Sequence, residues 1–174
     1  MRRFSPLVVG VPVVVALVLA GAVAVMFADL SRLRAREASG QEALAVARAI
    51  APDMLSYDHR TIEQDFARAG GYTTGALTGH YRRLLTTLGP PARHQRAVQS
   101  ATVTGAAVES ARPDRVEVLL FVNMSTVKTV PGEKEPRRQV SQNRARFVMA
   151  RVGARWLVAE LSTLLGDAPP LGGR

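Results

Sequence analysis

The sequence predicts an α+β fold in which a single N-terminal transmembrane helix is followed by helices packed on a curved antiparallel sheet. Three observations predict it. Phe4 to Ala28 is an almost wholly aliphatic run without a charged residue, the next part of the chain repeats apolar residues every three or four positions, and the last part repeats them every second position. Helical periods followed by consecutive strand periods are typical of α+β domains.

The uncharged run is long enough to cross a membrane. A hydrocarbon core about 30 Å thick takes roughly 20 apolar residues in a helix, so we expect a transmembrane anchor over residues 7–30 after a short cytoplasmic tail, residues 1–6. The alternative is a cleaved secretory signal, with Arg2 and Arg3 ahead of the apolar stretch and Ala22 to Ala24 as the cleavage site. The apolar residues beyond that site favour the retained anchor. Either interpretation exports the rest of the chain, so we expect a single-pass cell-membrane protein with an extracytoplasmic C-terminal domain.

Small residues recur on one face of the expected anchor, at Ala16, Ala20, Ala24 and Ala28. Because small side chains let membrane helices approach closely, this face is a candidate for packing against a partner helix. The other interpretation is that an alanine-rich chain produces such a spacing by chance, and the composition favours it.

A juxtamembrane helix is expected over residues 31–50, with solvated arginines on one side and an apolar stripe on the other. Pro52 should break or kink it, because proline cannot donate to the preceding turn. The globular domain then occupies residues 51–165, and a Gly- and Pro-rich flexible tail follows over residues 166–174.

Two further helices open the domain. Thr61 to Gln64 has the form of a capping box, which predicts a helix from there to about Ala69, ended by Gly70-Gly71. Thr73 or Thr74 can cap another helix that runs through Leu88, and Gly89-Pro90-Pro91 is expected to stop it.

Four strands are expected after these helices, over Ala97 to Glu109, Arg115 to Val130, Val140 to Val152 and Arg155 to Leu161. The second is the clearest, because apolar residues occupy every second position from Val116 to Met124. Gly153-Ala154 predicts a tight turn between the last two strands. Consecutive strands joined in this way form an antiparallel sheet.

The amino-acid composition excludes several kinds of functional site. The sequence has no cysteine, which excludes disulfides, thiol catalysis and Cys-ligated zinc. The formal net charge of +9 is compatible with an anionic partner, but arginine runs interleaved with aromatic residues are missing, so nucleic acid is not expected.

Basic residues are densest at Arg82, Arg83, Arg93, His94 and Arg96, and again at Arg137, Arg138, Arg144 and Arg146. Each cluster is either a solvated face or a contact for lipid headgroups or an acidic partner, with Arg82, Arg83, Arg93 and Arg96 as the candidates.

Three motifs carry a resemblance to a known family. They are Ser56 to Ala67 (SYDHRTIEQDFA), the Thr74-Gly75 turn ahead of Tyr81, and Gly153 to Val158 (GARWLV). With the single N-terminal span, these residues resemble actinobacterial Mce-associated membrane proteins along nearly the whole chain. The resemblance implies an NTF2-like extracytoplasmic cone similar to VirB8-type secretion components, and a role as accessory subunit of mammalian-cell-entry (Mce) lipid-import systems. His59 departs from the pattern, since the family often has a second aromatic residue there.

Because NTF2-like folds include enzymes, the ionisable residues of the cone are candidates for an acid–base pair. They are Asp53, Asp58, Asp65, His59, His80, Tyr57, Tyr72 and Tyr81. The sequence has no nucleophile elbow, no phosphate-binding glycine loop and no metal-ligand spacing among His59, His80 and His94. We therefore expect no catalytic, cofactor-binding or metal-binding residues, and no enzyme.

The expected function is a non-catalytic, membrane-anchored accessory subunit that stabilises or assembles an Mce-type lipid import system, with Mce transporter proteins as partners. The alternative from a different class is a carrier that holds a lipid or small molecule in the cone, and an NTF2-like enzyme comes third. A carrier needs an apolar cavity, an enzyme needs a buried acid or base in that cavity, and a scaffold needs neither.

Overall fold

The computed structural model describes residues 6–129, 132 and 135–164, and for residues 6–18 and Leu164 it describes the backbone alone. The predicted tail over residues 166–174 and residues 1–5 of the predicted cytoplasmic tail lie outside the described residues. The chain divides into two units, Met1–Ala38 and Ser39–Arg174. Each unit is described by itself below.

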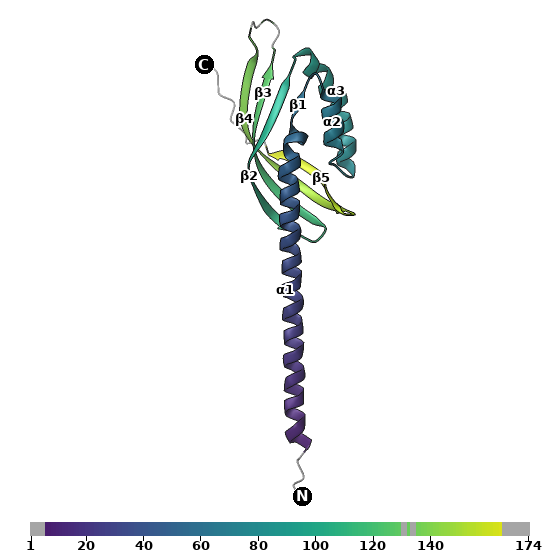
Figure 1. Cartoon of the computed structure of the whole chain (residues 1–174), viewed down its shortest axis with the longest axis vertical. Coiled ribbons are helices and arrows are strands. Elements are labelled where there is room, and N and C mark those ends of the chain that lie inside the picture. Colours follow the sequence, from purple (N-terminus) through teal and green to yellow (C-terminus); the bar gives the residue numbers. More distant parts are fainter. Residues whose placement is uncertain (1–5, 130–131, 133–134, 165–174) are drawn as a thin grey trace. The chain divides into compact units, whose positions relative to one another are not determined.

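Helix α1 (Pro6–Leu55) is continuous and includes the ranges expected for the anchor, 7–30, and for the juxtamembrane helix, 31–50 (Figure 1). In the first unit, residues 19–38 are all exposed. The large apolar side chains among them are Leu19, Val23, Val25, Met26, Phe27, Leu30 and Leu33. Within the part of the chain whose side chains are described, no helix has the length and hydropathy that crossing a membrane requires. Residues 7–18 of the predicted span lie outside that part.

The predicted break at Pro52 is wrong, because α1 continues past it to Leu55. Proline removes one backbone donor from the helix. The loss is tolerated because the surrounding turn is held by tertiary packing: Ala51, Met54 and Leu55 are all buried in the core of the second unit.

Helix α2 (Ile62–Gly70) begins where the sequence predicts, after Thr61, but the predicted capping box does not form. The Thr61 hydroxyl makes no cap bond to a backbone amide. It donates instead to the carboxylate of Asp65, at 2.9 Å. The hydroxyl therefore acts as a donor to a charged acceptor one turn away and not as the acceptor of a backbone amide that a cap requires.

Helix α3 (Ala76–His94) differs from the prediction at both ends. The residue before it is Gly75, at φ 62°, and the Thr73 hydroxyl donates to the Gly70 carbonyl at 2.7 Å, so neither threonine caps the helix. Gly89-Pro90-Pro91 lies inside α3 and does not stop it. The fixed proline φ suits a helix, and the turn after the prolines is held because Ala92 is buried against Ile62.

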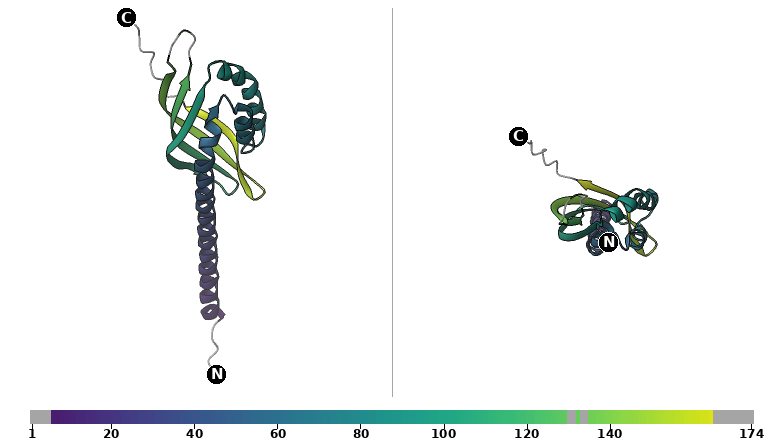
Figure 2. Two further views of the ribbon diagram at one scale, coloured as in Figure 1. Left: turned by 45° about the horizontal axis from the view of Figure 1, so that its top comes forward. Right: turned by 90° about the horizontal axis from the view of Figure 1, so that it is seen from above.

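Five antiparallel strands form one sheet in the order β1-β2-β3-β4-β5. Their bounds are β1 (Tyr57–Asp58), β2 (Val98–Ala111), β3 (Arg115–Lys128), β4 (Arg137–Val152) and β5 (Arg155–Leu164). The four long strands and the Gly153 turn, at φ 60°, confirm the prediction. The sequence did not predict β1, which pairs with β2 through Tyr57 and Gln99. The sheet curves, and α2 and α3 lie side by side (Figure 2).

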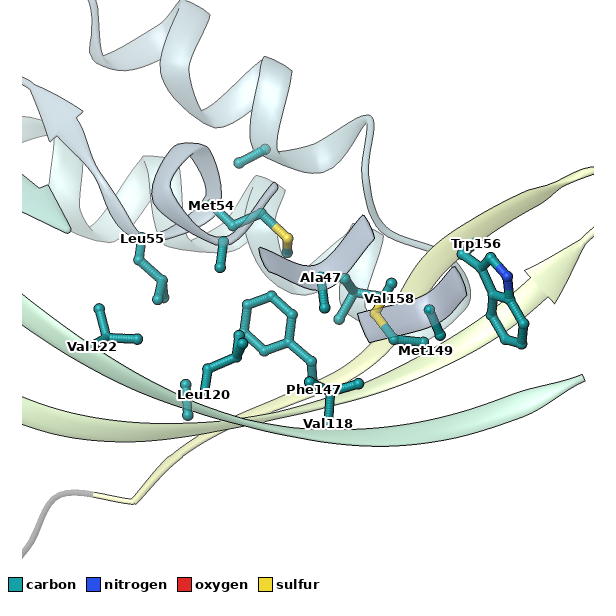
Figure 3. Close-up of a cluster of buried hydrophobic side chains, with 14 of the residues drawn as sticks. Ala47, Met54, Leu55, Val118, Leu120, Val122, Phe147, Met149, Trp156 and Val158 are labelled. Carbon is teal, nitrogen blue, oxygen red and sulfur yellow. The ribbon is translucent and has the colours of Figure 1, made fainter. Parts of the chain in front are cut away.

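The core of the second unit lies between the end of α1 and one face of the sheet (Figure 3). Ala43, Ala47 and Ala51 are fully buried at four-residue spacing, and their small side chains let the helix approach the sheet closely. The sheet supplies larger side chains to the same cluster, namely Val116, Val118, Leu120, Val122, Phe147, Met149, Trp156 and Val158. Side chains, with Phe147 at the centre, thus fill this part of the cone.

Candidate functional site

A cavity of about 310 Å³ lies beside this core, between the helices and the sheet. Most of its wall is apolar, from Met54, Leu55, Tyr57, Phe66, Ala69, Tyr81, Leu84, Leu88, Met124 and Leu161. The polar part of the wall comes from Ser56, Asp65, His80, Gln99 and Thr163. Small-molecule sites usually measure about 300 to 1,000 Å³, so this cavity stands at the lower end of that range.

Several polar groups of the wall hold the end of α1. The Tyr81 hydroxyl donates to the Met54 carbonyl at 3.0 Å, and Gln99 Nε2 donates to the Leu55 carbonyl at 2.8 Å. Ser56 Oγ accepts a hydrogen bond from a backbone amide of β2 at 2.9 Å. Burial raises the pKa of Tyr81 to about 12, so its phenol stays neutral and acts as a donor. These hydrogen bonds pair the polar groups of the cavity wall with backbone groups of α1 and β2, and they hold the end of α1 over the sheet.

Asp65 is the buried carboxylate of the cavity wall, and it joins β1 to α2. One oxygen accepts the Asp58 amide at 3.0 Å and the Thr61 hydroxyl at 2.9 Å, and the other accepts Arg68 Nη2 at 2.6 Å. Sequence reasoning considered Asp65 only as a possible acid or base. The signal for this structural role is its position inside the SYDHRTIEQDFA motif, four residues after Thr61, which precedes the helix.

Asp58 forms the turn between β1 and α2. Its carboxylate accepts hydrogen bonds from the Arg60 guanidinium, the shortest at 2.7 Å, and from the Arg60 amide at 2.9 Å. The guanidinium beside it lowers the pKa of Asp58 to about 2. His59 Nδ1 lies 3.2 Å from an Asp58 oxygen and is buried, in a geometry that makes no hydrogen bond.

Of the other acid–base candidates, Tyr57 and His80 line the same cavity as Asp65 and Tyr81, whereas Asp53 and Tyr72 do not. The Tyr72 hydroxyl donates to Asp53 at 3.1 Å, and this hydrogen bond raises the pKa of Tyr72. Tyr57 packs against Phe66, and His80 is exposed on α3 at the cavity rim. Within the described ranges, no three His, Asp or Glu side chains are grouped as metal ligands would be.

The predicted basic cluster on α3 is divided by the structure. Arg82 lines an apolar groove between α2 and α3, whereas Arg83 lines a separate cleft beside β5. Arg93 forms an ion pair with Glu63, and Arg96 is exposed beyond the helix end. Their role in contacting lipid headgroups or an acidic partner stays a prediction.

The predicted helix-packing face falls partly outside the described side chains. Ala20, Ala24 and Ala28 are exposed on α1, and the side chain of Ala16 is among those not described. Their role in packing against a partner helix stays a prediction.

Trp156 is buried, and its indole ring has two polar partners. The Arg151 guanidinium lies 4.6 Å from the centre of the indole ring. Trp156 Nε1 donates to Glu42 at 3.3 Å, and Glu42 also forms an ion pair with Arg151. The hydrogen bond from Trp156, with that from Arg151, lowers the pKa of Glu42. This cluster joins α1 to the β4–β5 hairpin.

The relatives found by sequence are mycobacterial, and no family model matches the chain. Uncharacterized protein Rv1362c of Mycobacterium tuberculosis is 29% identical over 110 residues, covering 63% of this chain and 48% of the relative. Outer membrane protein Rv1973 of Mycobacterium tuberculosis is 31% identical over 112 residues, covering 64% of this chain and 67% of the relative. The chain belongs to the Rv1973 family. It spans about half the length of Rv1362c, so it matches only part of that protein.

Solved structures show which fold this member of the Rv1973 family has. An IcmL-like type IV secretion system protein of Legionella pneumophila superposes with a TM-score of 0.56 at 12% identity, covering 76% of this chain and 96% of that one. CagV, a VirB8 homolog from Helicobacter pylori, gives 0.51 at 9% identity, covering 68% and 96%. An Ntf2-like protein involved in plasmid conjugation gives 0.50 at 14% identity, covering 77% and 51%. The predicted NTF2-like, VirB8-like arrangement of helices on an antiparallel sheet is confirmed.

Proposed function

We propose that this chain is a non-catalytic accessory subunit of an envelope transport complex, held in the cell membrane by the first part of α1, with its NTF2-like domain outside the cytoplasm. One observation carries the proposal. Large apolar side chains such as Val23, Met26 and Phe27 are each more than 60% exposed on α1, although the domain that follows has a filled core of its own. Exposed apolar surface of this kind is typical of segments that enter a membrane or contact another chain.

The domain's interior supports a scaffold more than an enzyme. The candidate acids Asp53, Asp58 and Asp65 each already accept a hydrogen bond from a neighbouring side chain. A general base needs a lone pair that can reach a substrate. The names of the structural neighbours, which are secretion and conjugation proteins, support the same class of role.

The transport system that we propose is an Mce-type lipid importer, with Mce transporter proteins as the partners. The resemblance carried by the SYDHRTIEQDFA and GARWLV motifs supports it, and the mycobacterial relatives are consistent with an envelope protein. A membrane anchor raises the local concentration of the domain at the membrane, so weak contacts with a transporter suffice.

The test is affinity purification of the full-length chain from its native membrane in mild detergent, with proteins and lipids identified in the same sample. We expect Mce proteins, their permease or their ATPase to co-purify, and their amounts to fall when the chain is deleted. Unchanged amounts of these proteins in the deletion strain would contradict the proposal.

The cavity of about 310 Å³ supports a second candidate, a carrier for a small apolar molecule. The same purification separates the two functions. A stoichiometric lipid or small molecule without transporter subunits is the result that a carrier gives and an accessory subunit does not. Replacing Leu84 on the cavity wall by Trp would fill the cavity, and would lower the bound ligand only if the cavity holds it.

A further inference from the structure

At one end of the sheet, the segments of β2, β3 and β4 carry basic residues and no acidic ones, while the adjoining β1 carries Asp58, which pairs with Arg60. The segments Val98–Ala107, Leu119–Lys128 and Arg137–Arg146 lie side by side in β2, β3 and β4 (Figure 1). None of them contains Asp or Glu. Their basic residues are Lys128, Arg137, Arg138, Arg144 and Arg146. Of these basic residues, Arg146 lines the same cleft as Arg83 of α3, whereas Arg138 and Arg144 do not line it.

Phe121 projects from this end of the sheet, on the face opposite the core. Its chain neighbours Leu120 and Val122 are buried in the core, so the alternation of the strand directs Phe121 outward, and its side chain is 40% exposed. The register places Gly105 beside it on β2 and Arg144 beside it on β4.

The Phe121 ring is held in place from both sides. The Arg144 guanidinium lies over it, 5.7 Å from the ring centre. On the other side the ring lies against the backbone of Gly105, where a Cβ atom would stand 3.4 Å from the ring carbon Cδ2. A large exposed aromatic ring is thus fixed in one orientation before any partner arrives, which lowers the entropy cost of binding.

The surrounding residues complete a surface that we call the outer patch, made of Phe121, Arg138, Val140, Gln142 and Arg144, all of them exposed. Val140 is 66% exposed, and Arg138 donates to the hydroxyl of Ser125 at 3.2 Å. Among the described residues, neither Arg138 nor Arg144 has a carboxylate within ion-pair distance.

Arg146, the next arginine on this face of β4, provides the contrast. It forms an ion pair with Glu109 at 2.6 Å, and this contact raises the pKa of its guanidinium. Within the part of the chain that the structure describes, Arg146 is thus neutralised by Glu109, whereas Arg138 and Arg144 of the outer patch form no ion pair.

We propose that the outer patch is a docking surface for an acidic segment of a partner protein, which packs an apolar side chain against Phe121 and Val140 and places carboxylates against Arg138 and Arg144. Aromatic residues and arginine are the types enriched in the energetically dominant part of protein interfaces. Arginine also pairs with a carboxylate through two parallel hydrogen bonds. The inference does not depend on which transport complex the chain joins.

A second copy of this chain fits the outer patch poorly. In a two-fold symmetric contact the same patch faces itself, so Arg138 and Arg144 would meet the arginines of the other copy, and none of the five residues of the patch is acidic. Like charges brought together at an interface cost several kcal/mol. The outer patch has positively charged side chains and no negatively charged ones, so we expect its partner to be acidic.

The test is photo-crosslinking of the full-length chain in its native membrane, with a photoreactive amino acid at position 140 and, as control, at position 152. Val140 and Val152 are both exposed valines of β4, and only the first belongs to the outer patch. We expect position 140 to crosslink to a protein segment with net negative charge, identified by mass spectrometry of the crosslinked peptide, and position 152 not to do so.

Charge reversal then tests the arginines. The pair R138E and R144E is expected to reduce the crosslink from position 140 on the order of tenfold or more, because like charges replace opposite ones. The pair R48E and R155E changes the net charge equally at exposed positions outside the patch, and should leave the yield unchanged. If R138E/R144E does not accumulate, the neutral pair R138Q and R144Q replaces it, and retained Trp156 fluorescence confirms folding.

Several outcomes overturn the inference. They are a crosslink to lipid alone, a crosslink to a second copy of this chain, no crosslink from position 140, and an equal loss of yield in the two charge-reversed pairs. A crosslinked peptide without net negative charge also contradicts it. Loss of the transporter from the purified sample with the crosslink retained would contradict the proposed Mce function and leave the docking surface intact.

Discussion

Asp65 offers a quantitative test of how the start of the domain is held together. The substitution Asp65→Ala removes the acceptor for the Asp58 amide, the Thr61 hydroxyl and the Arg68 guanidinium at once. Asp65 is buried, so water does not readily replace the carboxylate. We therefore expect a loss larger than that of an exposed ion pair.

The free-energy contributions of the hydrogen bonds and the ion pair of Asp65 differ because the exposure of their partners differs. A hydrogen bond to a charged group contributes about 1.5 to 3 kcal/mol, and leaving a buried donor unpaired costs about 1 to 3 kcal/mol. The side chain of Arg68 is 52% exposed, so its ion pair contributes less than about 1 kcal/mol. We expect Asp65→Ala to lower the free energy of unfolding by about 3 kcal/mol, and Arg68→Ala by less than about 1 kcal/mol.

Asp65→Asn tests the geometry within this cluster. Its amide oxygen can still accept the Asp58 amide and the Thr61 hydroxyl, while its NH₂ group faces the Arg68 guanidinium, donor to donor. The expected loss is intermediate, about 1 kcal/mol, since Arg68 can turn toward water.

The assay is thermal or urea unfolding of the full-length chain in mild detergent, followed by fluorescence. Trp156 is the only tryptophan in the sequence and is buried, so its emission reports unfolding of the domain. A loss of 3 kcal/mol corresponds to a decrease in Tm of roughly 10 °C for a domain of this size. If Asp65→Ala and Arg68→Ala lower stability equally, the amide and hydroxyl bonds contribute little and the reasoning is refuted.

Three further predictions use the same unfolding assay. Phe147→Ala should lower the free energy of unfolding by about 3 to 5 kcal/mol, because Phe147 is fully buried at the centre of the core; a loss below 1 kcal/mol would mean that the core is not packed as described. Gly153→Ala should cost roughly 1 to 2 kcal/mol, because its φ of 60° strains any residue with a Cβ, and an unchanged Tm would contradict this. The lowered pKa of Asp58, about 2, means that its contribution is present above pH 4 and lost as the pH falls toward 2. The stability difference between the wild-type chain and Asp58→Asn should therefore shrink over that range, and a constant difference would show that Arg60 does not stabilise the carboxylate.

The strands could be predicted because the two-residue period of their apolar side chains fixes which face of each strand is buried. From Val116 to Val122 every second residue is buried, and a shift of register by one would move all of them to solvent. The same holds for the end of α1, where Ala43, Ala47 and Ala51 repeat at helical spacing and are buried. A pattern that places many residues on one buried face is therefore still present when the rest of the domain has packed.

Element ends were predicted less well, because single residues decide them and tertiary contacts compete. Pro52 and the Pro90-Pro91 pair are helix breakers locally, yet each lies in a helix next to buried neighbours that hold the turn. The Thr61 hydroxyl was expected to accept a hydrogen bond from a backbone amide, but it donates to the Asp65 carboxylate, which packing places within reach. Local propensities of about 1 to 3 kcal/mol are small enough for one buried side chain to reverse.

Whether the domain is a carrier or a scaffold depends on how much of its interior is filled by side chains, and the periodicity of the sequence does not give this. Sequence alternation places Phe121 and Phe147 in strands but does not say how far the interior of a curved sheet is filled. In the structure Phe147 is completely buried beneath α1, whereas Phe121 is on the opposite face with Arg144 over its ring. The space left inside is the cavity of about 310 Å³, small for a lipid carrier, and the exposed aromatic residue lies outside. A cavity of this size together with an exposed Phe121 beneath Arg144 supports the proposed contact with another protein more than it supports a carrier of large ligands.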